Sequence, residues 1–281
     1  MKNHEKIYLS VKDNLVTGEV FNLVCNAEMD FLRTTPMPKS EDLPLYYESD
    51  EYISHTDKKK GLFSFLYQLV KKWSLQMKVK LILEQTGTIG LLLDVGAGTG
   101  DFLRAAKENG WAVNGMEPNR NASKLALEKG IHLKSSLKHF EGKQFDVITL
   151  WHVLEHIPNL DETVLALSKL VKPDGVLIIA VPNFKSYDAD HYGMFWAAYD
   201  APRHLWHFSK KSIQNIFSKA FILEKTKPMI FDSFYVSLLS EKYISGRKFS
   251  LNALWVGLVS NLKAIQSKEY SSHIYCFRKT K

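Results

Sequence analysis

The sequence has few cysteines and no long apolar run. Only two of its 281 residues are cysteines, Cys25 and Cys276, too few for the disulfide framework of a small secreted domain. No apolar run reaches the ~18 residues of a membrane-spanning helix, and the first residues lack the apolar core of a signal peptide. We therefore expect a soluble, cytoplasmic protein without a transmembrane segment.

Acidic residues are scarce in the last part of the chain. Residues 203–281 contain 14 Lys and Arg but only 4 Asp and Glu, a net charge of +10, whereas the whole chain carries +7. Such a region favours anionic partners such as phosphorylated metabolites, lipid head groups or nucleic acid. The lysines are spread along the region as on an ordinary solvated surface, so nucleic acid is not the favoured partner.

Three alternating glycines follow a short apolar run at residues 91–100, LLLDVGAGTG. The run is typical of a buried strand of a parallel sheet, and the helical pattern after it makes Gly96, Gly98 and Gly100 a turn between strand and helix. Glycine adopts positive φ freely, and its missing Cβ lets a ligand lie against the backbone. The turn is thus a candidate nucleotide site, with a tight turn without ligand as the alternative.

An acidic residue ends the next predicted strand. Glu117 lies 21 positions after Gly96, close to the ~20 expected for a carboxylate that accepts hydrogen bonds from ribose hydroxyls. Apolar strands follow at 145–150 and 175–182, and helical stretches occupy 121–129 and 160–171. This alternation predicts a doubly wound α/β sheet.

The order of these motifs resembles that of the class I S-adenosylmethionine-dependent methyltransferases, in particular the ubiquinone-biosynthesis type of small-molecule methyltransferase. The resemblance covers about residues 88–183: Asp94 to Gly100, Glu117, Asp146 to Ile157 and Pro173 to Asn183. It implies a Rossmann-like, mostly parallel seven-stranded sheet with an antiparallel last strand. It also implies S-adenosyl-L-methionine as cofactor and S-adenosyl-L-homocysteine as product.

The resemblance further implies where the cofactor binds. The glycine loop carries the methionine part, Glu117 binds the ribose and Asn119 lies beside the adenine. Many relatives have an acidic residue for the adenine amine, and this chain has LKSSL at 133–137 instead. The implied cofactor-binding residues are Asp94, Gly96, Ala97, Gly98, Gly100, Glu117, Pro118, Asn119, Ser136, Leu137, Trp151 and His152.

The segments around this core are organised differently. Residues 1–60 predict an N-terminal extension with short strands, and 61–230 the cofactor-binding core, which includes a cleft-covering segment at 184–208. Residues 231–281 predict a helical insertion and the final strand. The insertion suits a substrate lid, a dimer contact or peripheral contact with a membrane surface, so monomer and homodimer both stay open. Tyr52 and His55 resemble a segment that closes over the cofactor, with a plain surface loop as the alternative.

Four of the ten histidines are predicted to converge where the strands end. His152 and His156 follow the strand at 145–150, and His204 and His207 lie in the cleft-covering segment. We favour a catalytic group of His152, His204 and His207, in which a neutral histidine removes a proton from the methyl acceptor. Arg203 would clamp a carboxylate or phosphate of the substrate.

Two other interpretations of the histidines stay open. The resembled ubiquinone-biosynthesis and small-RNA methyltransferases carry Glu-x-x-Glu-His and a later His as a metal site. The corresponding residues here are His152, Glu155, His156 and His207. A divalent metal is not favoured, and an imidazole in place of a carboxylate would shift the preference from Mg²⁺ toward Zn²⁺. In the third interpretation these side chains only brace the structure.

The sequence thus predicts an S-adenosylmethionine-dependent methyltransferase that methylates oxygen of a small molecule or of a lipid-linked or glycan precursor, with a histidine general base. Alternatives are an RNA methyltransferase that uses the basic C-terminal region, a noncatalytic cofactor-binding partner subunit and a nicotinamide-dependent dehydrogenase. The Gly-Ala-Gly-Thr-Gly loop and the turn at Pro173 argue against the dehydrogenase. The acceptor itself is not named by these motifs.

Overall fold

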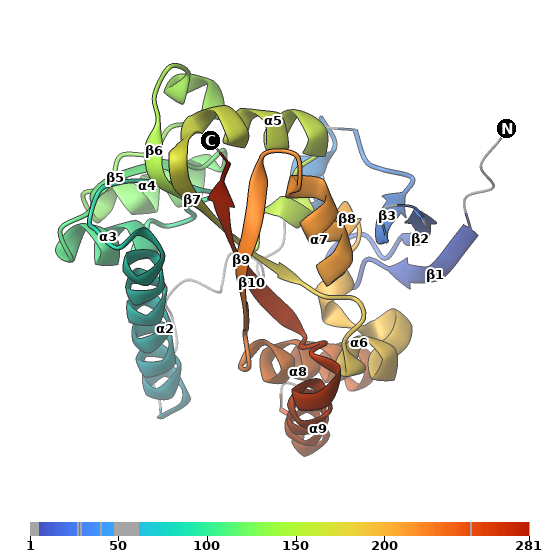
Figure 1. Ribbon diagram of the computed structural model, residues 1–281. Coiled ribbons are helices and arrows are strands. Elements are labelled where there is room, and N and C mark those ends of the chain that lie inside the picture. Colours follow the sequence, from blue (N-terminus) through green and yellow to red (C-terminus); the bar gives the residue numbers. More distant parts are fainter. Residues whose placement is uncertain are drawn as a thin grey trace, which may run out of the picture.

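The strands in the part of the chain that the structure describes form one sheet of six and one of four (Figure 1). The computed structural model describes residues 6–26, 28, 30–39, 41–47, 62–247 and 249–280. Within these ranges, no helix combines the length and apolar character needed to cross a membrane.

The six-stranded sheet is mixed. Its strands are β4 (Leu91–Val95), β5 (Ala112–Met116), β6 (Phe145–Trp151), β7 (Val171–Pro182), β9 (Phe221–Pro228) and β10 (Ser272–Lys279). The order across the sheet is β5-β4-β6-β7-β10-β9. β4 to β7 pair in parallel, whereas β10 runs antiparallel to both of its neighbours. The predicted mixed α/β sheet with an antiparallel last strand is confirmed.

The predicted seventh strand is reduced to one bridge, so the described chain has six strands in this sheet. Lys134 bridges Met116 in parallel at the outer edge beside β5, and its amide donates to the carbonyl of Gly115 at 2.9 Å. Ser136 then caps a 3₁₀ turn, Leu137–Phe140, by accepting from the amide of Lys138. This side-chain cap offers the backbone an alternative to the strand ladder.

Helices cover both faces of this sheet. The helices α2 (Leu62–Thr86), α3 (Asp101–Glu108) and α4 (Arg120–Glu128) contribute to one core, and α5 (Leu160–Leu170) and α7 (Lys210–Phe217) to the other. Because successive side chains of a strand point to opposite faces of the sheet, neighbouring residues of β4 lie in different cores. Leu92 packs with Ile82 and Phe102, whereas Leu93 packs with Leu167 and Ile213.

The four-stranded sheet joins the N-terminal extension to the core. It consists of β1 (Lys6–Lys12), β2 (Val20–Asn26), β3 (Phe31–Thr35) and β8 (Trp206–His207), all antiparallel. β8 comes from the segment expected to cover the cleft, and its His207 lies opposite Leu32 of β3. Leu23 and Leu32 share a core with Trp196 and Tyr199, so much of this segment is structural.

Two helices lie between β9 and β10 in the sequence. They are α8 (Asp232–Ser245) and α9 (Leu251–Ser267), and they pack on each other and on α6 (Tyr187–Tyr192). The approach is close because α9 has Gly257 at the crossing, where an added Cβ would lie 3.0 Å from Cα of Phe234. In Figure 1 the pair lies at the lower end of the molecule, with α9 outermost.

Candidate active site

The glycine loop connects β4 to α3, and its three glycines differ in what surrounds them. Gly96, Gly98 and Gly100 have φ of 71°, 52° and 75°. An added Cβ would overlap the side chain of Val153 at Gly96 and lie 3.0 Å from Cβ of Ala126 at Gly100. At Gly98 it would meet nothing within 4 Å. Gly96 and Gly100 therefore serve packing, and the free space lies above Gly98.

Glu117 lies against this loop. Its two carboxylate oxygens accept from the amides of Gly98 and Asn119, both at 2.8 Å. Asn119 also caps α4 by accepting from the amides of Asn121 and Ala122. Each oxygen of Glu117 keeps a further lone pair, which a ribose hydroxyl can use. The structure thus brings the loop and this acid together, as the spacing predicts.

A buried carboxyl and a lysine lie below the loop. Asp94 is buried, and its Oδ1 accepts from the Thr149 hydroxyl at 2.6 Å. Burial raises the pKa of Asp94 to about 7, although Thr149 and the Lys78 ammonium oppose the rise. Lys78 comes from α2, and its Nζ lies 4.3 Å from the ring centroid of Trp151. Burial lowers the pKa of Lys78, and Asp94 acts against this.

The sequence motifs do not include Lys78, nor Asp232, the first residue of α8. Both reach the site from helices that flank the motif-bearing core, and neither has a characteristic spacing from the glycine loop. The sequence offers one signal for each: Lys78 belongs to a helix expected to pack against the core sheet, and Asp232 to an insertion for which a substrate lid was one expectation. Their positions depend on how these helices dock, which residue spacing does not encode.

His152 occupies a strained backbone position directly after β6. Its φ is 56°, in the left-handed region that costs a residue other than glycine of order 1–3 kcal/mol. The conformation is held by its amide, which donates to the carbonyl of Ala180 at 2.9 Å. Such strain clusters at functional sites, and it aims this imidazole at two carboxylates.

The two carboxylates decide the charge of His152. Its Nε2 lies 3.2 Å from Oδ2 of Asp232, and its Nδ1 lies 3.4 Å from Oε1 of Glu155. Burial alone would lower the pKa of His152, but these carboxylates outweigh it and raise the pKa to about 10. His152 therefore favours its protonated form, and the predicted base, a neutral histidine, forms only when this proton is lost.

Glu155 lies among histidines in the interior. The side chains of Glu155, His156 and His204 place ligand atoms within 4.8 Å of one another. Burial would raise the pKa of Glu155, but His152, His204 and His156 hold it low. Burial, together with the neighbouring His204, lowers the pKa of His156 to about 4, and its Nδ1 lies 3.0 Å from the carbonyl oxygen of Arg203. One buried carboxylate thus faces three imidazoles.

The predicted metal set, His152, Glu155, His156 and His207, does not fit a divalent ion. His207 lies elsewhere, with its Nε2 3.1 Å from the Thr34 hydroxyl, and His204 takes its place beside Glu155. His152 is also not among the side chains whose ligand atoms lie together at Glu155. We therefore derive no catalytic step through a metal.

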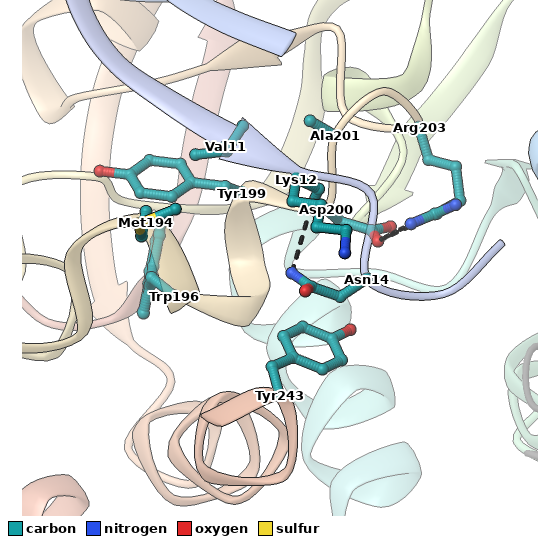
Figure 2. A pocket seen from close by; sticks show the side chains of 10 residues that line it. All are labelled: Val11, Lys12, Asn14, Met194, Trp196, Tyr199, Asp200, Ala201, Arg203 and Tyr243. Carbon is teal, nitrogen blue, oxygen red and sulfur yellow. Dashed lines mark hydrogen bonds and ion pairs between the residues drawn. The ribbon is translucent and has the colours of Figure 1, made fainter. Parts of the chain in front are cut away.

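Arg203 does not clamp a substrate. Its side chain is 1% exposed, and it donates to Asp200 and Asp13 at 2.7 and 2.9 Å and to the carbonyl of Tyr46 at 2.9 Å. Figure 2 shows the guanidinium directed at Asp200. Because Asp13 lies after β1, the arginine ties the N-terminal sheet to the segment expected to cover the cleft. The predicted role is wrong because this ion network engages all parts of the guanidinium.

A small cavity beside Arg203 is not an acceptor site. Its volume is about 10 Å³, room for one water molecule at most. It is lined by Val11, Lys12, Asn14, Met194, Trp196, Tyr199, Asp200, Ala201, Arg203 and Tyr243 (Figure 2).

His204 and His207 are likewise structural in this arrangement. Nδ1 of His204 lies 2.8 Å from the carbonyl oxygen of Ala198, and burial lowers the pKa of His207 well below its usual range. Their predicted catalytic roles are therefore not supported by the geometry, which leaves His152. Tyr52 and His55 lie outside the described residues.

The other predicted cofactor residues lie around the loop. Ala97 donates its amide to the carbonyl of Met116, and the Trp151 ring lies 5.5 Å from that of Phe102. Pro118 is exposed, and Ser136 and Leu137 are half-buried.

Comparisons with known proteins agree with this arrangement. Residues 65–220, more than half of the chain, match the family of the methyltransferase domain. The ubiquinone biosynthesis O-methyltransferase of Vibrio atlanticus is 35% identical over 125 residues, which cover 40% of this chain and 53% of that protein. The Salmonella paratyphi A protein of the same name is 35% identical over 104 residues, 33% of this chain and 42% of that protein. The chain spans about half the length of these curated relatives.

Solved structures share the fold at low identity. Phosphoethanolamine N-methyltransferase 2 of Haemonchus contortus, in complex with S-adenosyl-L-methionine, superposes with a TM-score of 0.53 at 17% identity, covering 100% of this chain and 70% of that chain. A SAM-dependent methyltransferase from Archaeoglobus fulgidus gives 0.51 at 17% identity, covering 77% and 100%. The chain therefore belongs to the methyltransferase domain family.

Proposed function

We propose that this protein methylates a hydroxyl group of a small molecule or of a lipid-linked or glycan precursor. The observation that carries the proposal is the position of His152 between Asp232 and Glu155, next to the glycine loop. The following residue, Val153, lies against Gly96, so the imidazole is presented beside the cofactor site. The names of the curated relatives, O-methyltransferases, support oxygen as the acceptor atom.

The residues around the loop fit S-adenosylmethionine. The open side of Gly98 would admit the ligand, Glu117 would accept from the ribose hydroxyls, and the Lys78 ammonium beside Trp151 would pair with the carboxylate of the methionine part. Asn119 and Ser136 would lie beside the adenine. When bound, S-adenosylmethionine supplies a methyl group made electrophilic by its sulfonium charge.

The chain's own task is to orient the hydroxyl, exclude water and take one proton. For this step His152 gives its Nε2 proton to solvent, and the acceptor hydroxyl lies at Nε2 in the place that Asp232 takes in this structure. The neutral imidazole then accepts the proton of the hydroxyl, while Glu155 at Nδ1 orients the ring and the two carboxylates stabilise the imidazolium that forms. These carboxylates make the histidine a strong base but keep it protonated near neutral pH.

The acceptor class is tested by transfer of an isotopically labelled methyl group to matched phenols, alkyl alcohols and amines. We expect product with hydroxyl acceptors and little with the amine of the same shape, because His152 is placed to take a hydroxyl proton. Mass spectrometry of the products distinguishes O- from N-methylation. Exclusive N-methylation would contradict the proposal.

The rate is expected to rise with pH into the alkaline range. Neutral His152 is required, and its pKa is raised to about 10, so kcat should increase by about tenfold per pH unit below that value. Asp232→Asn removes one carboxylate and should move the rising limb to lower pH by about one unit or more. The pH profile of kcat checks this, with Asp161→Asn, an exposed change on α5, as control. Identical profiles for wild type and Asp232→Asn would rule out His152 as the base.

A further inference from the structure

The outer face of α9 is a continuous row of large apolar side chains. The spacing is helical, so the side chains lie along one side of the helix. Leu251 is 74% and Trp255 63% exposed. We call this row the α9 stripe: Leu251, Leu254, Trp255, Leu258, Leu262 and Ile265.

The inner face of α9 is made mostly of small residues. Ala253, Val256, Gly257, Ser260 and Ala264 are buried, on the side where α9 packs against α8 and α6. A surface helix of a globular domain ordinarily turns its large apolar residues to the core. Here the fold buries the small side chains and leaves the large ones outside. Packing of this domain therefore does not account for the α9 stripe.

The sequence segment that carries the stripe is basic. The sequence from 242 to 268 contains five Lys and Arg and no Asp or Glu. Arg247 just before α9 and Lys263 on α9 are both exposed. A helix with an apolar row, a tryptophan and flanking cations has the composition of helices that lie in the interface of an anionic bilayer.

Neighbouring residues widen the apolar surface. Four further apolar side chains are each about half exposed: Phe231 just before α8, Tyr235 and Ile244 on α8, and Phe249 before α9. Figure 1 shows α9 as the outermost element at this end of the molecule. A helix of this length extends roughly 25 Å, so it can lie flat on a planar surface.

We propose that the α8–α9 pair docks on an anionic phospholipid bilayer, with the α9 stripe in the interface and the flanking cations at the lipid phosphates. A second copy of the chain fits less well, because a symmetric pairing of stripes would bring like charges together. The proposal goes beyond the proposed function and does not depend on it, since binding to a bilayer needs no methyl transfer.

The test is co-sedimentation of the full chain with phosphatidylglycerol vesicles and with phosphatidylcholine vesicles. We expect binding to the anionic vesicles that weakens with salt, and much weaker binding to the zwitterionic ones. Leu251→Ser with Trp255→Ser should lower the affinity by about tenfold or more, and Arg247→Glu with Lys263→Glu likewise. The control is Leu127→Ser with Leu165→Ser, which removes half-exposed leucines on α4 and α5, away from the α9 stripe, and should leave binding unchanged.

Circular dichroism and binding of S-adenosylmethionine show whether each variant is folded, whatever its activity. The proposal is overturned if the wild type does not bind anionic vesicles, or if the variant with Leu251→Ser and Trp255→Ser binds them as tightly as the wild type. A dimer in size-exclusion chromatography that this variant dissociates, without vesicle binding by either protein, would also overturn it.

Discussion

Replacing His152 by asparagine is expected to lower kcat by about 10²–10⁴-fold, the usual contribution of a general base. Asparagine tolerates the left-handed backbone at this position better than other residues, so the loop should keep its shape. It cannot take the proton that the imidazole takes between Asp232 and Glu155. Steady-state kinetics with saturating cofactor measure the loss.

Two variants separate this effect from a loss of cofactor binding. His152→Asn should bind S-adenosylmethionine with unchanged affinity in calorimetry, whereas Glu117→Gln should bind it about tenfold to a hundredfold more weakly, because the ribose loses a charged acceptor. His191→Asn changes an exposed histidine on α6 and should behave as wild type. If His152→Asn turns over at the wild-type rate, the histidine only supports the backbone.

Replacing Arg203 by alanine is expected to lower the free energy of unfolding by about 3–5 kcal/mol. The change leaves the carboxylates of Asp13 and Asp200 in the interior without their cation. Urea denaturation measures the loss, and its midpoint is compared with that of Arg104→Ala. Arg104 makes an exposed pair with Glu108 on α3, so its loss should cost at most about 1 kcal/mol.

The same network predicts sensitivity to acid. Burial would raise the pKa of Asp13 and Asp200, but Arg203, with backbone amides at Asp13, holds both pKa values below the usual range. Their contribution to stability is therefore present above the ordinary aspartate pKa of about 4 and lost as pH falls through the lower folded values. Arg203→Ala should be less acid-sensitive than wild type, and equal losses in the two proteins would show that the network is not the cause.

Local sequence determined the class of the fold and the half of the site that binds the cofactor. The apolar runs of β4, β6 and β7 are long enough to be buried strands, and the helical stretches between them make their parallel pairing the expected result. The contact of Glu117 with Gly98 follows from two strand ends that lie next to each other. The parallel pairing and this contact depend on residues that are close in the sequence, so they can be predicted from residue spacing.

The catalytic half of the site was predicted only in part. Residue spacing placed His152 at the end of β6, but its charge depends on Asp232, 80 positions later in the sequence. Arg203 and His207 have residue types suited to catalysis, yet their partners are Asp13 and Thr34 of the N-terminal extension. No local pattern indicates that β8 pairs with β3 or that Arg203 pairs with Asp13.

What the sequence by itself determined is therefore the methyltransferase core from the glycine loop to Glu117, because adjacent strands of a parallel sheet bring these motifs to one edge. Only the tertiary structure decided which polar side chains remain available for chemistry, because pairing across long stretches of chain sets their burial and charge. It also decided that α9 turns its small residues inward, which leaves the α9 stripe exposed for a membrane surface.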